Sequence, residues 1–160
     1  MILMTLGTIP YPFDRAISWL AVLLEQGIIT EPVFVQYGAS DISLLQKYPN
    51  VTAESTVERD RLLSLMDDAR LVISHAGQGS TRLLAERGAA FVLLPRLKLY
   101  EEHIDDHQLG FAQAVAESGV QLCQTLGDLE AAVRNPPDNF GKKLFEGPSL
   151  SQHLTEVYPT

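Results

Sequence analysis

A glycine-rich turn at His75–Thr81, with the sequence HAGQGST, contains the residue types best suited to ligand chemistry. It lies between an apolar run, Leu71–Ser74, and a helical pattern. Glycines let the backbone approach a ligand closely, and the free amides and dipole of a helix N-terminus attract anions. Ser80 and Thr81 add hydroxyl donors, whereas no Gly-Lys-Ser/Thr follows as in a Walker loop. The turn predicts a diphosphate site without a lysine, although its glycines also suit an ordinary strand-to-helix turn.

A second polar segment, Pro95–Gln108, follows the next apolar run and contains two histidines, His103 and His107, four residues apart. Two imidazoles beside carboxylates suit zinc, but no distant third ligand is evident. The segment also suits a solvated loop that ends in a helix cap, or a loop that contacts a sugar. Because it follows a parallel strand, we expect it at the same carboxyl edge of the sheet as the glycine turn, where ligands bind.

Strand-like and helical segments alternate along the chain, which predicts an α/β fold with a parallel sheet. We expect Asp14 to cap the first helix and Gly88 to end the third. The strands are predicted at Ile2–Leu6, Pro32–Tyr37, Asn50–Ala53, Leu71–Ser74, Phe91–Leu94 and Val120–Cys123. The helices are predicted at Asp14–Gln26, Val57–Asp67, Ser80–Arg87, Ile104–Ser118 and Leu126–Val133.

The chain length of 160 residues suits a single domain, 1–160, with a core at about 1–135. Pro136 and Pro137 break the last core helix. The tail, 136–160, contains one weak helical pattern at Leu150–Val157. Because the first residues already form a core strand, we expect no companion domain before them.

The chain is acidic, with a net charge of −8 and an isoelectric point near 4.9. This charge argues against nucleic-acid binding and against direct docking on anionic lipid, since both depend on Lys and Arg. The longest apolar stretch, Ala16–Leu24, is interrupted by Ser18 and is too short to span a membrane. A single cysteine, Cys123, suits a reducing compartment and reads as a buried strand residue. We therefore expect a cytoplasmic protein.

Several segments together resemble the C-terminal, donor-binding domain of family 28 glycosyltransferases. They are Leu6–Thr8 with Pro12–Arg15, Phe34–Gln36, Ile73–Ser80 and Pro95–Gln108, which occur in family order across roughly residues 2–129. The chain resembles in particular the short PssE-type bacterial polysaccharide proteins. It is also similar to the small catalytic subunit of the eukaryotic enzyme that adds the second N-acetylglucosamine to a dolichol-linked precursor. The resemblance implies a Rossmann-like domain equivalent to the C-terminal half of a GT-B fold.

The resemblance also implies roles for individual residues. The donor diphosphate would bind at Gly77, Gln78, Gly79, Ser80 and Thr81, and the donor sugar at Gln108, His107 and Asp106. Residues facing the interdomain cleft or a partner would be Gly7, Thr8, Arg96 and Lys98. His75 is the candidate general base in this chain, or else a structural histidine beneath the turn. The family pattern is broken at Leu83, where some members have a ribose-binding glutamate, and at Ile9, where a histidine is common.

The implied function is that of the donor-binding, catalytic subunit of a split, inverting hexosyltransferase. It would transfer a sugar from a UDP-sugar to a lipid-linked acceptor in surface or exopolysaccharide synthesis, without a metal or other cofactor. A membrane-associated partner subunit would bind the acceptor and hold this chain at the inner face of the membrane. The alternative is a non-catalytic subunit that binds the nucleotide sugar or stabilises its partner.

Overall fold

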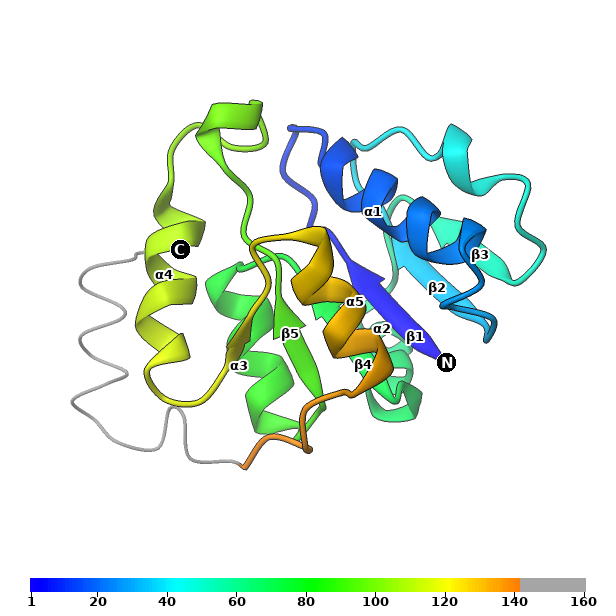
Figure 1. Cartoon of the computed structure of the whole chain (residues 1–160). Helices are drawn as coiled ribbons and strands as arrows, with labels where there is room; N and C mark the ends of the chain where they lie inside the picture. Colours follow the sequence, from blue (N-terminus) through cyan, green and yellow to red (C-terminus); the bar gives the residue numbers. More distant parts are fainter. Residues whose placement is uncertain (142–160) are drawn as a thin grey trace.

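The computed structural model describes residues 1–141, which form a six-stranded, fully parallel sheet flanked by helices (Figure 1). The sheet order is β3-β2-β1-β4-β5-β6. The strands are β1 (Ile2–Thr5), β2 (Val33–Gln36), β3 (Val51–Glu54), β4 (Leu71–Ser74), β5 (Phe91–Leu93) and β6 (Gln121–Leu122). The predicted α/β fold is confirmed.

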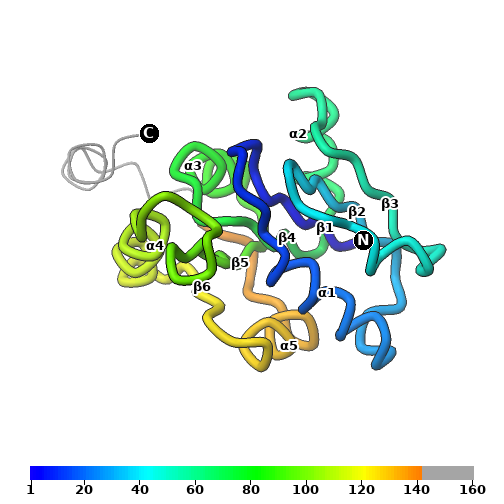
Figure 2. The backbone as a smooth tube through the Cα atoms, turned by 90° about the horizontal axis from the view of Figure 1, so that it is seen from above, coloured from blue at the N-terminus to red at the C-terminus, as the bar shows by residue number. Residues whose placement is uncertain are grey.

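Within residues 1–141, five α-helices and two short 3-10 turns lie between or after the strands. They are α1 (Asp14–Glu25), η1 (Ser43–Leu45), α2 (Arg59–Asp68), α3 (Gln78–Glu86), η2 (Lys98–Tyr100), α4 (His107–Ala116) and α5 (Leu126–Arg134). Figure 2 shows α1 and α5 on one side of the sheet and α2 and α3 on the other. Side chains of α4 pack in the same apolar cluster as those of α2 and α3.

The alternation of side chains along each strand supplies both apolar layers. In β1, Ile2 and Met4 pack toward α1 and α5, whereas Leu3 packs toward the opposite helices, and all three are fully buried. A strand covered on both faces must be apolar at every position, which explains the uninterrupted hydrophobic runs in the sequence. The chain reverses its direction of winding between β1 and β4, so the topological switch point lies there.

The predicted starts of α2, α3 and α4 and the predicted cap of α1 differ from the observed ones. Helix α2 begins at Arg59 instead of Val57, with Glu58 as its N-cap. The helix after the glycine turn begins at Gln78, two residues earlier than expected, with Gly77 as its N-cap. The next predicted helix begins at His107 instead of Ile104, with Asp106 at its N-cap position, because residues 101–106 form turns and bends. Asp14 is the first helical residue instead of the cap, and Phe13 occupies the cap position.

The packed part of the chain extends at least to Phe140, whose amide donates to the carbonyl of Ala89 at 2.9 Å. Its ring lies 5.6 Å from that of Phe91, between ring centroids. The weak helix predicted at Leu150–Val157 lies outside the described residues. Within residues 1–141, no helix is both long and apolar enough to cross a membrane.

Candidate functional site

The glycine turn places the start of α3 at the carboxyl end of β4, next to the switch point. Gln78, Gly79 and Ser80 form the first turn, and helix geometry leaves their amides without intrahelical acceptors. The first intrahelical bond runs from the Thr81 amide to the Gly77 carbonyl at 3.0 Å. Space is open beside Gly79, because a Cβ added there meets nothing within 4 Å. These amides can therefore reach an anion.

Thr81 takes a different position from the other residues of the turn. Its side chain is fully buried, and its hydroxyl donates to the Gly77 carbonyl at 2.8 Å. The hydroxyl therefore stabilises the turn from inside, whereas Gly77, Gly79 and Ser80 of the predicted diphosphate site line the open space.

His75 lies beneath the turn, between two glycines. A Cβ at Gly7, which has φ +78°, would come within 2.8 Å of the His75 ring, and a Cβ at Gly77 would also overlap it. The imidazole is only 7% exposed. Burial, and secondarily the charge of Arg96, lower the pKa of His75 to about 4, so the ring is neutral at physiological pH.

Gln108 fixes the tautomer of His75. The Gln108 Oε1 accepts from the Arg96 amide at 3.1 Å, which orients the side-chain amide and points its Nε2 at His75 Nδ1, 3.1 Å away. Because this nitrogen donates, Nδ1 accepts and the proton of the neutral ring is on Nε2. The Nδ1 lone pair is then occupied by the Gln108 amide and Nε2 carries the proton, which argues against His75 as the general base.

Arg96 is buried, so the expectation that it faces the cleft or a partner is wrong. Its side chain is 0% exposed, and its guanidinium donates to the carbonyls of Leu6, Tyr11 and Glu102. These carbonyls belong to loops that turn inward at the carboxyl edge of the sheet, where they need a donor. Desolvation lowers the pKa of Arg96 to about 10, which still leaves it charged at neutral pH.

The remaining predicted residues of the second segment lie at the surface. Lys98, Asp106 and His107 are exposed, and the Asp106 carboxylate accepts from the Lys98 amide at 2.9 Å. Asp105 lies between the two histidines, 3.0 Å from His103 Nδ1 and 3.3 Å from His107 Nδ1. Among residues 1–141, no group of three or more His, Cys, Asp or Glu side chains is arranged to hold a metal ion.

A cavity of about 500 Å³ adjoins the glycine turn. Gly77, Gly79 and Ser80 line it together with the apolar side chains of Val57, Leu62 and Met66. Gly7, Thr8 and Ile9 close it from the loop after β1. The cavity thus combines free backbone donors with an apolar wall, as nucleotide sites do.

Sequence analysis missed the contribution of Gln36 to this cavity. Its side-chain Oε1 accepts from the Gly7 backbone amide at 3.0 Å. Its Nε2 donates to the backbone carbonyls of Gly7 and Ser55 at 2.9 and 2.8 Å. Gln36 thereby joins the loops after β1 and β3. The available signal was a polar residue at the end of an otherwise apolar buried strand.

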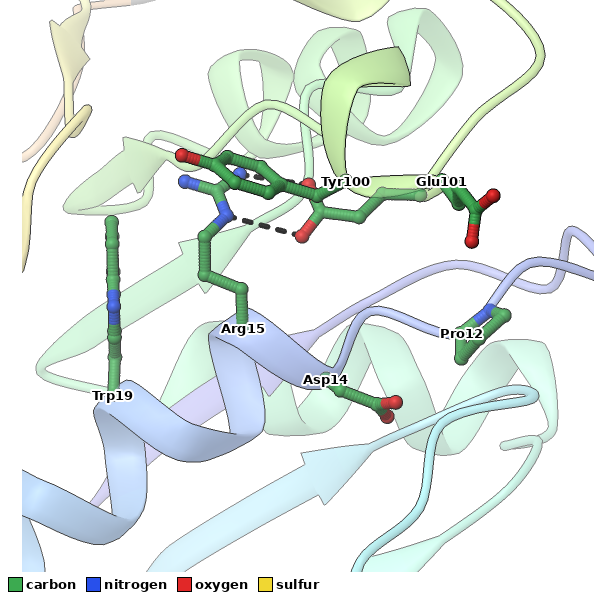
Figure 3. Close-up of a pocket in the computed structure, with 7 residues that line it drawn as sticks. Pro12, Asp14, Arg15, Trp19, Tyr100 and Glu101 are labelled. Carbon is green, nitrogen blue, oxygen red and sulfur yellow. Dashed lines mark hydrogen bonds and ion pairs between the residues drawn. The ribbon is translucent and has the colours of Figure 1, made fainter.

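An ion pair between Arg15 of α1 and Glu102 was also missed. It borders a second cleft, of about 510 Å³, in which Trp19 and Tyr100 flank Arg15 (Figure 3). Both partners are largely buried, with exposed fractions of 14% and 2%. A charged residue in a loop is usually solvated, so residue type alone gave no indication of this pairing.

A parallel sheet with an open helix start at its switch point defines a Rossmann-like α/β domain. The chain belongs to the glycosyltransferase family 28 C-terminal domain family, whose model matches residues 1–144. No curated protein matches the sequence.

Solved glycosyltransferase structures share the fold. MurG of Acinetobacter baumannii superposes with a TM-score of 0.64 and 18% identity, over 98% of this chain and 48% of that one. SnogD of Streptomyces nogalater superposes with a TM-score of 0.56 and 19% identity, over 98% of this chain and 38% of SnogD. The solution structure of ALG13 superposes with a TM-score of 0.61 and 18% identity, over 100% of this chain and 97% of ALG13. The chain therefore spans less than half of the first two proteins and nearly all of the third.

Proposed function

We propose that this chain is the donor-binding, catalytic subunit of a two-component, inverting hexosyltransferase that uses a UDP-sugar. The observation that carries the proposal is the open first turn of α3 beside a cavity with an apolar wall, in a chain of this glycosyltransferase family. The amides of Gln78, Gly79 and Ser80 bind the diphosphate. The uracil and ribose lie toward Val57 and Leu62.

The donor sugar contacts Gln108, with His107 and Asp106 beside it. Gln108 holds His75 and the Arg96 backbone with one N–H and one lone pair, which leaves a second N–H and a second lone pair for sugar hydroxyls. Transfer inverts the anomeric carbon and releases UDP. Preorganised turn amides stabilise the charge that develops on the leaving diphosphate, so the proposal needs no metal and no other cofactor.

The acceptor half of the enzyme is a separate, membrane-associated chain that binds a lipid-linked acceptor for surface or exopolysaccharide synthesis. Because His75 Nε2 carries a proton, the partner supplies the general base. Exposed apolar side chains beside the site, at Leu99, Tyr100 and Ile104, support such a contact. The partner would keep this otherwise cytoplasmic chain at the inner face of the membrane. A non-catalytic subunit that binds the donor or stabilises its partner is the alternative function.

A charge placed in the first turn of α3 tests the donor site. Gly79 is the second residue of α3, and Gly127 is the second residue of α5. Gly79→Asp puts a carboxylate where the diphosphate binds, and we expect it to weaken UDP binding at least about 100-fold in calorimetry, because like charges repel at close range. The matched control Gly127→Asp should bind UDP like the wild type.

Equal UDP affinity in both variants and the wild type would overturn the donor site. Catalysis is tested separately with the purified partner and acceptor, by comparing Gln108→Ala with the wild type. Unchanged transfer by Gln108→Ala would favour the non-catalytic subunit.

A further inference from the structure

Residues 95–106, between β5 and α4, are held by an ion pair that the proposed donor contacts do not use. The Glu102 carboxylate is 2% exposed and receives two bonds from Arg15 of α1, from Nη2 at 2.9 Å and from Nε at 3.1 Å (Figure 3). A buried carboxylate is costly unless it is paired and hydrogen-bonded. The segment therefore has a strongly preferred position, set by α1.

The same glutamate closes a turn within the segment. Its Oε1 accepts from the Leu97 amide at 2.9 Å, and its own amide donates to the Leu97 carbonyl at 3.1 Å. Its carbonyl accepts from Arg96 Nη1 at 3.0 Å. Arg15 Nη2 also reaches the Pro95 carbonyl at 2.9 Å. Both ends of the turn are thus tied to one carboxylate and one guanidinium.

Aromatic rings hold Arg15 in this geometry. Its guanidinium carbon lies 4.9 Å from the centroid of a Trp19 ring and 5.2 Å from that of Tyr100. It is also 5.4 Å from the centroid of Phe13. A planar cation between aromatic faces and a bidentate carboxylate has little freedom to change rotamer. The pair behaves as a rigid clamp.

The clamped segment is bonded to residues that contact the sugar in the proposed function: Asp106 lies at its end, and Gln108 follows in the first turn of α4. The Arg96 amide donates to Gln108 Oε1 at 3.1 Å, and the Lys98 amide donates to the Asp106 carboxylate at 2.9 Å. Within residues 1–141, the hydrogen bonds of the Glu102 side chain and carbonyl go to Arg15, Arg96 and Leu97, and none of these residues belongs to the glycine turn. Movement of the segment would displace the sugar contacts while leaving the turn amides in place.

We propose that Arg15 and Glu102 are positioning residues that set the affinity for the donor sugar without touching the donor. This inference rests on the proposed function, because it requires UDP to bind at the turn and the sugar at Gln108. It predicts that loss of the clamp reduces the advantage of a UDP-sugar over UDP. General destabilisation would instead weaken both ligands together.

The test compares UDP with UDP-glucose, UDP-galactose, UDP-N-acetylglucosamine and UDP-glucuronate by calorimetry on the full chain. For the sugar that the wild type binds best, Arg15→Met should lower the affinity ratio of UDP-sugar to UDP at least about tenfold. Its UDP affinity should change less than about twofold. Arg15→Lys keeps the charge but loses the bidentate fork, and should recover part of the ratio. Arg87→Met, which removes an exposed ion pair with Asp67, is the matched control.

Equal losses for UDP and UDP-sugar, or an unchanged ratio in Arg15→Met, would overturn the clamp. Failure of the wild type to bind UDP contradicts the proposed function instead. Amide hydrogen exchange tests the clamp without any ligand, so it is informative even in that case. If Arg15→Met is unstable, the milder variant Glu102→Gln takes its place. Exchange at Leu97 and Glu102 should accelerate while exchange at Thr81 does not, and uniform acceleration would contradict a local role.

Discussion

At the scale of single residues, His75 and Gln108 define one hydrogen-bonded unit beneath the glycine turn. Gln108 donates to Nδ1, so the ring is neutral and presents Nε2–H. The ring also occupies the space that side chains at positions 7 and 77 would need, which explains why both are glycine. His75 therefore supports the turn sterically, and its chemistry is that of a donor.

The lowered pKa of His75 makes stability depend on pH. The folded-state pKa is about 4, below the ordinary value of 6.5, so the unfolded chain binds more protons between these values. The folded state is therefore favoured most above pH 6.5, where His75 is neutral in both states. This stability is lost as the pH falls toward 4, because the unfolded chain binds the proton first. A shift of this size corresponds to about 3 kcal/mol. We expect the free energy of unfolding, measured by urea titration, to fall across this window.

The variant His75→Gln separates this effect from other titrations. It removes one titrating group and leaves the rest of the chain unchanged as a common background. Its stability should depend less steeply on pH between 6.5 and 4 than that of the wild type. Identical slopes in the two proteins would show that His75 is not the source.

At the scale of elements, the sequence predicted the strands and most helices because continuous apolar runs and helical periodicity are local signals. The start of α4 was missed because residues 101–106 form turns and bends instead of a helix, and the Asp106 carboxylate accepts from the Lys98 amide eight residues earlier. The glycine turn was predicted from residue type and order, and Gln108 from the resemblance to family 28 glycosyltransferases. Their contact was not, since it depends on how β4 and α4 lie in the folded sheet.

Arg96 shows most clearly what could not be predicted. Arginine is rarely fully buried, and nothing in the sequence identifies which loop carbonyls turn inward. The structure uses this one side chain to join the loop after β1, through Leu6 and Tyr11, to the segment around Glu102. Such long-range pairing is specified by tertiary geometry, so a local pattern does not reveal it.

This buried role predicts a large loss of stability in Arg96→Met. The substitution leaves three carbonyls without their donor in the interior, and we expect the free energy of unfolding to fall by about 3 kcal/mol or more. The control is Arg134→Met, which removes an exposed pair with Glu130 and should cost less than about 1 kcal/mol. Urea unfolding of the two variants checks the difference. Similar losses would mean that Arg96 contributes no more than a surface arginine.

At the scale of the whole molecule, the loops after β1, β4 and β5 meet at one edge of the sheet and form the candidate site there. Large hydrophobic side chains are exposed to solvent at the same edge. Within residues 1–141, the large hydrophobic side chains that stand out as exposed are Leu44, Leu99, Tyr100 and Ile104, and three of these four lie between β5 and α4. The clamp holds this segment rigid, which lowers the entropic cost of binding a partner.

We therefore expect the association with the proposed acceptor-binding chain to depend on Leu99 and Ile104, which are 80% and 66% exposed. The double variant Leu99→Ser/Ile104→Ser should weaken that association at least about tenfold, because exposed apolar anchors contribute most when they become buried in an interface. Leu44→Ser, at a site 53% exposed on η1, is the matched control and should bind like the wild type. Binding of the purified partner is measured by calorimetry, with UDP binding as the check that the donor site is intact. Equal partner affinity in the double variant and the control would place the interface on another face of the molecule.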